Sequence, residues 1–347
     1  MSSMLFVMPT SAVGGGNVKI IHYLSHARSL GLRVGLWVTQ DNDPINWSPQ
    51  SVADIHIRTP ETLKEWDTIF FTWAPDWPKI SERLTSPLSE QHIIHIIQHI
   101  RHINPDFLNG YALHLLQTKA FSRICVSPEV AETITPYVKN TALMKTIPNV
   151  IDTRLFHPTF RWITPSRPLK VLYANWKTTF GNRIRDYWQS THARDTIIFE
   201  SIDHPLSQQA FAHRMRAADI FIGTPNKTEG FYLAPLEAMA SAVAVICPDV
   251  IGNRSFCLRN VTCLMPVYDD LDGHVSTLRQ FLDDPNLRHT IARNGYQKAR
   301  SRQWWDERGD FLCFLQRLTP ISSTTSHCDE NVATTVTSHE TMANLRD

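Results

Sequence analysis

Residues 228–246 read TEGFYLAPLEAMASAVAVI, and this stretch decides the fold more than any other part of the chain. It follows a short apolar run at 220–223 that has the length of a buried strand, and a loop containing Pro225 and Gly230. The segment LEAMA then predicts a helix, and VAVI predicts a second buried strand. The order strand, loop, helix, strand is typical of a parallel sheet whose carboxyl edge carries the loop.

This loop is a candidate ligand site. It leads into a helix N-terminus, where free N–H groups and the positive end of the dipole favour a phosphate. Gly230 lets the backbone approach a ligand closely. Glu229 in the loop and Glu237 in the helix can face one cleft, where carboxylates suit the hydroxyls of a ribose and of a sugar. The alternative is a capping acid and a solvated helix glutamate, but the glycine, the apolar helix and the buried strand favour a site.

The same alternation of strand and helix extends in both directions from this stretch. The first half has strand patterns at 5–8, 34–38, 68–72, 92–97 and 124–127, and helix patterns at 17–30, 108–118 and 128–138. The second half has strand patterns at 171–173, 196–200, 220–223, 244–247 and 263–265, and helix patterns at 208–217, 233–241, 273–283, 285–301 and 304–318. An α/β fold with two parallel sheets, each covered by helices on both faces, is therefore expected.

The alternation breaks at residues 147–158, IPNVIDTRLFHP, which prolines bracket. We expect a Rossmann-like first domain at 1–151, a second at 152–303, and a helix at 304–318 that packs back toward the first domain. From residue 319 the composition shifts to Ser, Thr, Asn, Glu and His, so the tail 319–347 is expected to be disordered.

Composition limits the functional classes. The chain has 347 residues with 34 basic and 33 acidic side chains, which suits two domains and not the basic body of a general nucleic-acid binder. Its 6 cysteines show no metal-binding or disulfide pattern, so a reducing cytosol is the simplest location. The apolar run at 4–8 lacks the features of a signal peptide, and no run reaches the ~18 residues of a membrane span. We expect a cytoplasmic protein, either free or peripheral to a membrane, with no integral membrane segment.

The stretch 229–240 resembles the Glu-x7-Glu motif of retaining GT-B glycosyltransferases of family four, whose usual form is EGFGLPxLEAMA. Tyr232 replaces the second glycine, and Pro235 is shifted by one position. Residues 147–158 are similar to the family's linker motif PNGVDxxxFxP, and the Gly14–Gly16 loop and residues 284–295 extend the likeness to about residues 4–318. The resemblance implies a GT-B fold, with two Rossmann-like domains whose parallel sheets face a central cleft.

The resemblance also implies roles in binding a nucleotide-diphosphate sugar. Glu237 takes the ribose, and Glu229 lies near the transferred sugar and is, with His99 and Lys177, one of the three catalytic candidates. The turn that supplies backbone amides to the donor consists of Gly230, Phe231 and Tyr232. Of the glycine loop, Gly15 and Gly16 line the cleft and face the donor phosphates.

Other implied contacts rest on cations and histidines. In ANWKTTFGNR, residues 174–183, Lys177 and Arg183 are the candidates for the basic pair that neutralises the leaving diphosphate, where other enzymes use a metal. Relatives place a histidine over the cleft after a strand such as 92–97, which points to His99 and, second, to His102. Surface or packing histidines are the alternative, and a zinc site with His95 lacks supporting acids or cysteines.

Two further motifs bear on the acceptor and on metals. Trp73 and Trp77 follow a strand edge in WAPDWP, where exposed aromatics could stack on an acceptor sugar or base, unless the loop is simply packed. The Asp-x-Asp sets at 41–43 and 270–272 do not suit Mn²⁺, because the first follows a strand in a polar loop and the second can cap a helix.

These features predict a retaining, metal-independent glycosyltransferase without a cofactor, in which a nucleotide sugar donor binds the second domain. The acceptor hydroxyl is unidentified, and the first domain is expected to bind it. A glycan or lipid-linked glycan is favoured, and a modified DNA base, as phage enzymes use, stays open despite the balanced charge. A GT-B epimerase or phosphorylase and a catalytically inactive sugar- or protein-binding GT-B module are the remaining alternatives.

Overall fold

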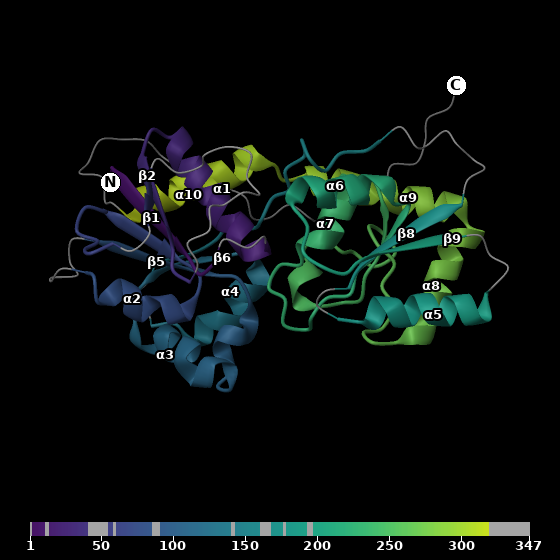
Figure 1. Ribbon diagram of the computed structural model, residues 1–347, viewed down its shortest axis with the longest axis horizontal. Helices are drawn as coiled ribbons and strands as arrows, with labels where there is room; N and C mark the ends of the chain where they lie inside the picture. Colours follow the sequence, from purple (N-terminus) through teal and green to yellow (C-terminus); the bar gives the residue numbers. More distant parts are fainter. Residues whose placement is uncertain are drawn as a thin grey trace, which may run out of the picture.

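The computed structural model describes residues 2–10, 14–40, 55–57, 60–84, 91–139, 143–159, 168–175, 178–192 and 197–318. Two parallel β-sheets lie side by side along the long axis of the molecule, and helices cover both faces of each (Figure 1). This is the expected α/β architecture with two Rossmann-like units. No helix in the described part of the chain is long and apolar enough to cross a membrane.

The first sheet has the order β3-β2-β1-β4-β5-β6-β7, and all of its described pairs are parallel. Its strands are β1 (Ser3–Met8), β2 (Arg33–Val38), β3 (Ile55–Ile57), β4 (Thr68–Phe71), β5 (His92–Ile97), β6 (Ser122–Cys125) and β7 (Met144–Thr146). The chain order reverses between β1 and β4, so the crevice at their carboxyl ends is where doubly wound sheets bind ligands.

Side chains of β1 alternate between the two faces of this sheet. Met4 and Phe6 join a core with α1 and α4, whereas Leu5 and Val7 join a core with α2 and α3. The helices on this sheet are α1 (Gly15–Ser29), α2 (Trp77–Ser81), α3 (Tyr111–Thr118) and α4 (Pro128–Ile134), with 3-10 turns η1 (Ala74–Asp76), η3 (Ile100–Ile103), η4 (Phe107–Gly110) and η5 (Thr135–Tyr137). Burial on both faces explains why β1 is apolar throughout.

The second sheet has the order β11-β10-β8-β9 and is also parallel. Its strands are β8 (Leu169–Ala174), β9 (Ile197–Ile202), β10 (Ile220–Ile222) and β11 (Ala244–Ile246). Around it lie α5 (Phe180–Thr191), α6 (Gln208–Ala217), α7 (Leu233–Ala240), α8 (Leu271–Asp283), α9 (Pro285–Arg300) and the 3-10 turn η7 (Ile251–Asn253). One core lies under α6 and α7 and the other under α5, α8 and α9, so this sheet is also buried on both faces.

The last described helix, α10 (Trp304–Leu318), lies against the first sheet beside α1 (Figure 1). Phe311 and Phe314 belong to the same core as β1 and α1, and both are fully buried. Glu307 of α10 reaches Lys19 of α1, and its other carboxylate oxygen lies 3.0 Å from His26 Nε2. The chain thus returns to the first sheet after completing the second.

The structure departs from the predicted elements in several places. Helix α5, the turns η1 and α2 in place of a loop at 73–78, and the short edge strands β3 and β7 were not predicted. The helix expected from 108 begins at 111, because Leu108 and Asn109 adopt left-handed backbone angles. The strand expected at 263–265 is reduced to two isolated bridges, one between Leu264 and Ile246 and one between Cys263 and Arg259. The predicted disordered tail, 319–347, and the first Asp-x-Asp set, 41–43, lie outside the described residues.

Candidate functional site

A cavity of about 360 Å³ lies between the two sheets and is lined by both. From the first sheet it receives the segments that follow β1 and β5, and from the second the segments that follow β8, β9 and β10. These are carboxyl ends of parallel strands, where open α/β sheets bind ligands. The predicted residues that line it are Gly15, Gly16, His99, Glu229, Phe231, Tyr232 and Glu237.

At one end of the cavity the two halves of the chain meet through their backbones. His99, which follows β5, and Glu229, which follows β10, form an antiparallel bridge. Gly230 lies so close that an added Cβ would overlap the Gln98 carbonyl oxygen and lie 2.6 Å from the His99 Cα. Gly230 is therefore required for contact between the two halves, in addition to its predicted place in the ligand-binding turn.

Replacing Gly230 by alanine is expected to destabilise the protein by about 1–3 kcal/mol, because the new methyl group overpacks a backbone contact. The matched control is Gly309→Ala, since a Cβ at that helical position meets nothing within 4 Å. That change is expected to be neutral or to stabilise the helix by up to about 1 kcal/mol. Urea unfolding of both variants measures the difference, and equal stability of the two would contradict the steric account.

Two helices begin at the cavity without a side-chain cap, namely α1 after Gly14 and α7 after Tyr232. Helices α4, α6, α8 and α9 have side-chain caps, among them Asp270, which accepts from the Gly273 N–H at 3.0 Å, whereas α2, α3 and α5 also lack a side-chain cap but contribute no residue to the cavity lining. The two open ends approach each other, since a Cβ at Gly15 would lie 3.1 Å from Leu233 Cδ1. Unsatisfied N–H groups and two positive dipole ends thus face one space, which suits a diphosphate.

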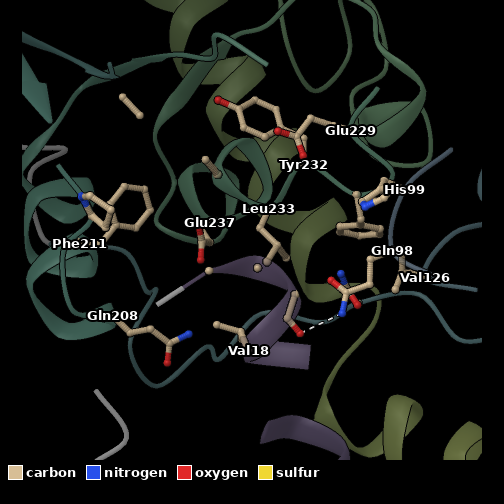
Figure 2. A pocket seen from close by; sticks show the side chains of 18 of the residues that line it. Val18, Gln98, His99, Val126, Gln208, Phe211, Glu229, Tyr232, Leu233 and Glu237 are labelled. Atoms are coloured by element: carbon tan, nitrogen blue, oxygen red, sulfur yellow. Dashed lines mark hydrogen bonds between the residues drawn. The ribbon is translucent and has the colours of Figure 1, made fainter. Parts of the chain in front are cut away.

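Glu237 extends from α7 into the middle of the cavity (Figure 2). No hydrogen bond joins its carboxylate to another described residue, and burial raises its pKa to about 8. Ligand hydroxyl groups that donate hydrogen bonds would stabilise a half-buried carboxylate that has no such partner in the protein. This placement agrees with contact to a sugar or ribose and not with a solvated surface glutamate.

Tyr232 supports the loop on which Glu229 lies. Its buried hydroxyl accepts a hydrogen bond from the Thr224 N–H at 3.2 Å, and Thr224 Oγ1 donates to the Ala174 carbonyl at 2.9 Å. Burial raises the pKa of Tyr232 well above its usual value, so the phenol is neutral. The tyrosine that replaces a glycine of the family motif therefore connects the loop after β10 to the end of β8.

His99 borders the cavity close to Glu229 (Figure 2). Burial, together with the nearby His102 and Arg101, lowers the pKa of His99 to about 2, so its imidazole is neutral at pH 7. His102 lies behind it, with Nδ1 placed 3.0 Å from the His99 carbonyl, and burial lowers its pKa to about 4. His102 contacts the backbone that carries His99 and does not line the cavity.

Three further predicted residues, Arg183, Trp73 and Trp77, are not brought to the cavity. Arg183 lies on α5, where it stacks over Phe180 and is 3.3 Å from an oxygen of Asp269. Trp77 is buried against Phe71 and Phe121, and Trp73 packs edge-on to Phe107. Burial of the Trp77 ring leaves it no surface for an acceptor, whereas Trp73 is half-buried and the acceptor role expected for it stays a prediction. Lys177 lies outside the described residues.

The structure adds contacts that the sequence reasoning missed. Leu206, in the segment between β9 and α6, and Gln208 and Phe211, in α6, form the end of the cavity opposite His99 (Figure 2). Arg101 and Asn149 also line it. The topology could have indicated this contact, because the segment after β9 must emerge at the same sheet edge as the Glu229 loop. The residue types of that segment do not by themselves mark a binding site.

Comparison with known proteins agrees with this geometry. Residues 186–298 match the family model described as "Glycosyl transferases group 1". A segment of 86 residues is 35% identical to the lipopolysaccharide core biosynthesis mannosyltransferase LpsB of Rhizobium meliloti, and this segment covers 24% of this chain and 24% of that protein. The likeness to this curated relative therefore spans about a quarter of its length.

Solved structures match over nearly the whole chain. Sucrose-phosphate synthase of Thermosynechococcus elongatus has a TM-score of 0.72 at 16% identity, over 91% of this chain and 99% of that one. Anabaena HepE in complex with UDP has a TM-score of 0.69 at 16% identity, over 92% and 100% of the two chains. At this identity the likeness establishes the fold, and the predicted GT-B architecture is confirmed.

Proposed function

We propose that this chain is a retaining glycosyltransferase that moves a sugar from a nucleotide-diphosphate sugar to an acceptor hydroxyl without a metal ion. The observation that carries the proposal is the arrangement of Glu229 and Glu237 around two uncapped helix ends in one interdomain cavity. The family match over residues 186–298 supports it, because that segment contains both glutamates. The mannosyltransferase segment and the UDP-glucose complex of HepE also support a nucleotide sugar as donor.

The donor is proposed to lie along the cavity in a defined order. Its nucleoside occupies the end formed by Phe211 and Gln208, and its ribose hydroxyls donate to Glu237 (Figure 2). The diphosphate faces the first turns of α1 and α7, where main-chain N–H groups stabilise its growing negative charge. The transferred sugar then reaches Glu229 and His99, and the neutral imidazole can accept or donate a hydrogen bond there.

During transfer, the bond between the anomeric carbon and the phosphate oxygen breaks, and the acceptor oxygen bonds to the same carbon from the same face. The acceptor proton passes to the leaving phosphate, so no covalent protein intermediate is required. The backbone bridge between His99 and Glu229 holds the two halves of the chain together beside the transferred sugar, where exclusion of water would favour transfer over hydrolysis.

A panel of UDP-, GDP- and ADP-sugars tests this proposal. We expect the full chain to hydrolyse one donor slowly in the absence of an acceptor, and NMR of the first product should show that the released sugar keeps the anomeric configuration of the donor. Glu237→Gln is expected to abolish most of this turnover, whereas Arg279→Gln, on the outer helix α8, is the control. Turnover with inversion would contradict the retaining mechanism, and no turnover or binding of any donor would contradict the enzyme assignment.

A further inference from the structure

A second cavity of about 260 Å³ adjoins the first and is lined by His99, Arg101, Asn226, Thr228 and Glu229. It shares His99, Arg101 and Glu229 with the main cavity. These shared residues lie at the end of the main cavity opposite Phe211 and Gln208, as the labelled side chains of Figure 2 show for His99 and Glu229. The second cavity therefore continues from the place where the proposed donor presents its sugar.

The chemistry of this second cavity differs from that of the main one. All of its described lining side chains are polar, and Arg101 is the single permanent cation among them. The Arg101 guanidinium lies 4.9 Å from the centre of the Phe107 ring, which holds it in place by a cation–π contact. Within the described parts of the chain, Arg101 forms no ion pair with a carboxylate.

We propose that this second cavity binds the acceptor, and that Arg101 binds an anionic group on it, either a phosphate monoester or a carboxylate. A guanidinium recognises both groups through paired hydrogen bonds. Asn226 and Thr228 can bond the hydroxyls of the same molecule, because one offers an amide and the other a hydroxyl group. This inference rests on the proposed glycosyltransferase function.

Two observations assign the anion to the acceptor and not to the donor. The donor diphosphate has its own place at the uncapped starts of α1 and α7, which Gly15 and Leu233 bring together. Arg101 instead lies on η3, after the bridge residue His99, where the two cavities meet beside the proposed position of the transferred sugar. Because His99 is neutral and Glu229 is an acid, only Arg101 among the described lining residues favours an anion there.

Calorimetric titration of the full chain in saturating UDP tests the inference. The affinity for glucose 6-phosphate is compared with that for glucose, and the affinity for glucuronate is likewise compared with that for glucose. We expect each anionic ligand to bind at least tenfold more tightly than glucose. Arg101→Gln should remove this preference, Arg101→Lys should keep part of it, and Arg279→Gln should behave as wild type. Equal affinity for charged and neutral ligands, no detectable binding of the anions, or an unchanged preference in Arg101→Gln would overturn the inference.

UDP binding, measured on the same samples, separates this failure from that of the proposed function. Normal UDP binding without an anion preference overturns the acceptor assignment alone. If none of UDP, GDP and ADP binds, both the acceptor assignment and the proposed glycosyltransferase function are overturned. A further arm compares UDP-glucuronate with UDP-glucose. Arg101→Gln could reduce the preference for UDP-glucuronate over UDP-glucose and leave the preference for the anionic acceptor ligands over glucose unchanged. In that case the anion belongs to the donor sugar, and the acceptor assignment is wrong.

Discussion

Replacing Glu237 by glutamine is expected to weaken binding of the nucleotide donor by about tenfold to a hundredfold, since hydrogen bonds to a charged group contribute about 1.5–3 kcal/mol. The glutamine keeps the size of the side chain and removes only the charge that two ribose hydroxyls would share. Glu237→Ala should have an equal or larger effect. Fluorescence or calorimetric titration with the donor provides the measurement.

The control is Glu65→Gln, because Glu65 lies in an exposed ion pair with Arg33 away from the cavity.

Glu237 also predicts a pH dependence of donor binding. Its pKa of about 8 in the empty cavity means that most molecules carry a neutral carboxyl at pH 7. If the ionised form binds the ribose, binding releases a proton, so donor affinity should rise from pH 6 to 8 and level off above it. The assigned role would be contradicted if the donor affinity of the wild type did not change between pH 6 and 8, or if Glu237→Gln showed the same pH dependence as the wild type.

Replacing Glu307 by alanine is expected to destabilise the protein by about 3–5 kcal/mol, the usual effect of removing one partner from a buried ion pair. Glu307 is fully buried and binds Lys19, His22 and His26 of α1, so it fastens the last helix to the first sheet. Burial alone would raise the pKa of Glu307, but Lys19 and the two histidines outweigh it and hold that pKa well below its usual value. The carboxylate is therefore charged, and its removal leaves Lys19 buried without its partner.

The depressed pKa of Glu307 sets the direction of the acid effect. Its stabilising contribution is present above the unfolded-state pKa of about 4.3 and is lost as pH falls through the lower folded-state value. Burial lowers the pKa of His26 as well, so protonation of the unfolded chain below about pH 6.5 adds to the loss. Stability should therefore decrease in the wild type as pH falls below about 6.5, and the further decrease below about pH 4.3 should be smaller in Glu307→Gln.

Urea unfolding of Glu307→Ala measures this effect, and Glu65→Ala is the matched control. The Arg33–Glu65 pair spans 2.8 Å but is about half exposed on both sides, so its loss should cost less than about 1 kcal/mol. The double variant Lys19→Met with Glu307→Leu should recover part of the loss, because it leaves no unpaired charge from this pair. Equal stability of Glu307→Ala and Glu65→Ala would show that the buried network does not fasten α10.

The elements around the Glu229 loop were predictable because each has a strong local signal. Apolar runs of strand length surround a glycine-containing loop and an apolar helix, and β10, α7 and β11 begin within a few residues of the predicted positions. Helix α5 was missed because its sequence, FGNRIRDYWQST, has few apolar residues, and only their helical spacing reveals the buried face of Ile184 and Trp188. The strand expected at 263–265 is apolar but forms isolated bridges in place of a ladder, so packing accounts for its burial.

The cavity was predictable in part for a similar reason. Glu229 and His99 lie in loops that follow one strand each, and Glu237 lies in the helix after the Glu229 loop. Sequence patterns locate these strands and this helix, and with them the three residues. The contact of Gly230 with the Gln98 carbonyl depends on how the two sheets face each other, and nothing local encodes it. The same holds for Phe211 and Arg101, whose neighbours in the cavity are distant in sequence. For Trp77 the sequence left two possibilities open, an exposed acceptor contact and a packed loop residue, and its place in the core agrees with the second.

The most direct test of the account is calorimetric titration of the full chain with UDP, GDP and ADP, in the wild type, Glu237→Gln and Glu65→Gln. The account predicts saturable one-to-one binding of at least one nucleoside diphosphate, weakened at least tenfold by Glu237→Gln and unchanged by Glu65→Gln. Absence of binding by all three nucleotides, or binding that Glu237→Gln leaves unaltered, would contradict the claim that this cavity holds a nucleotide sugar.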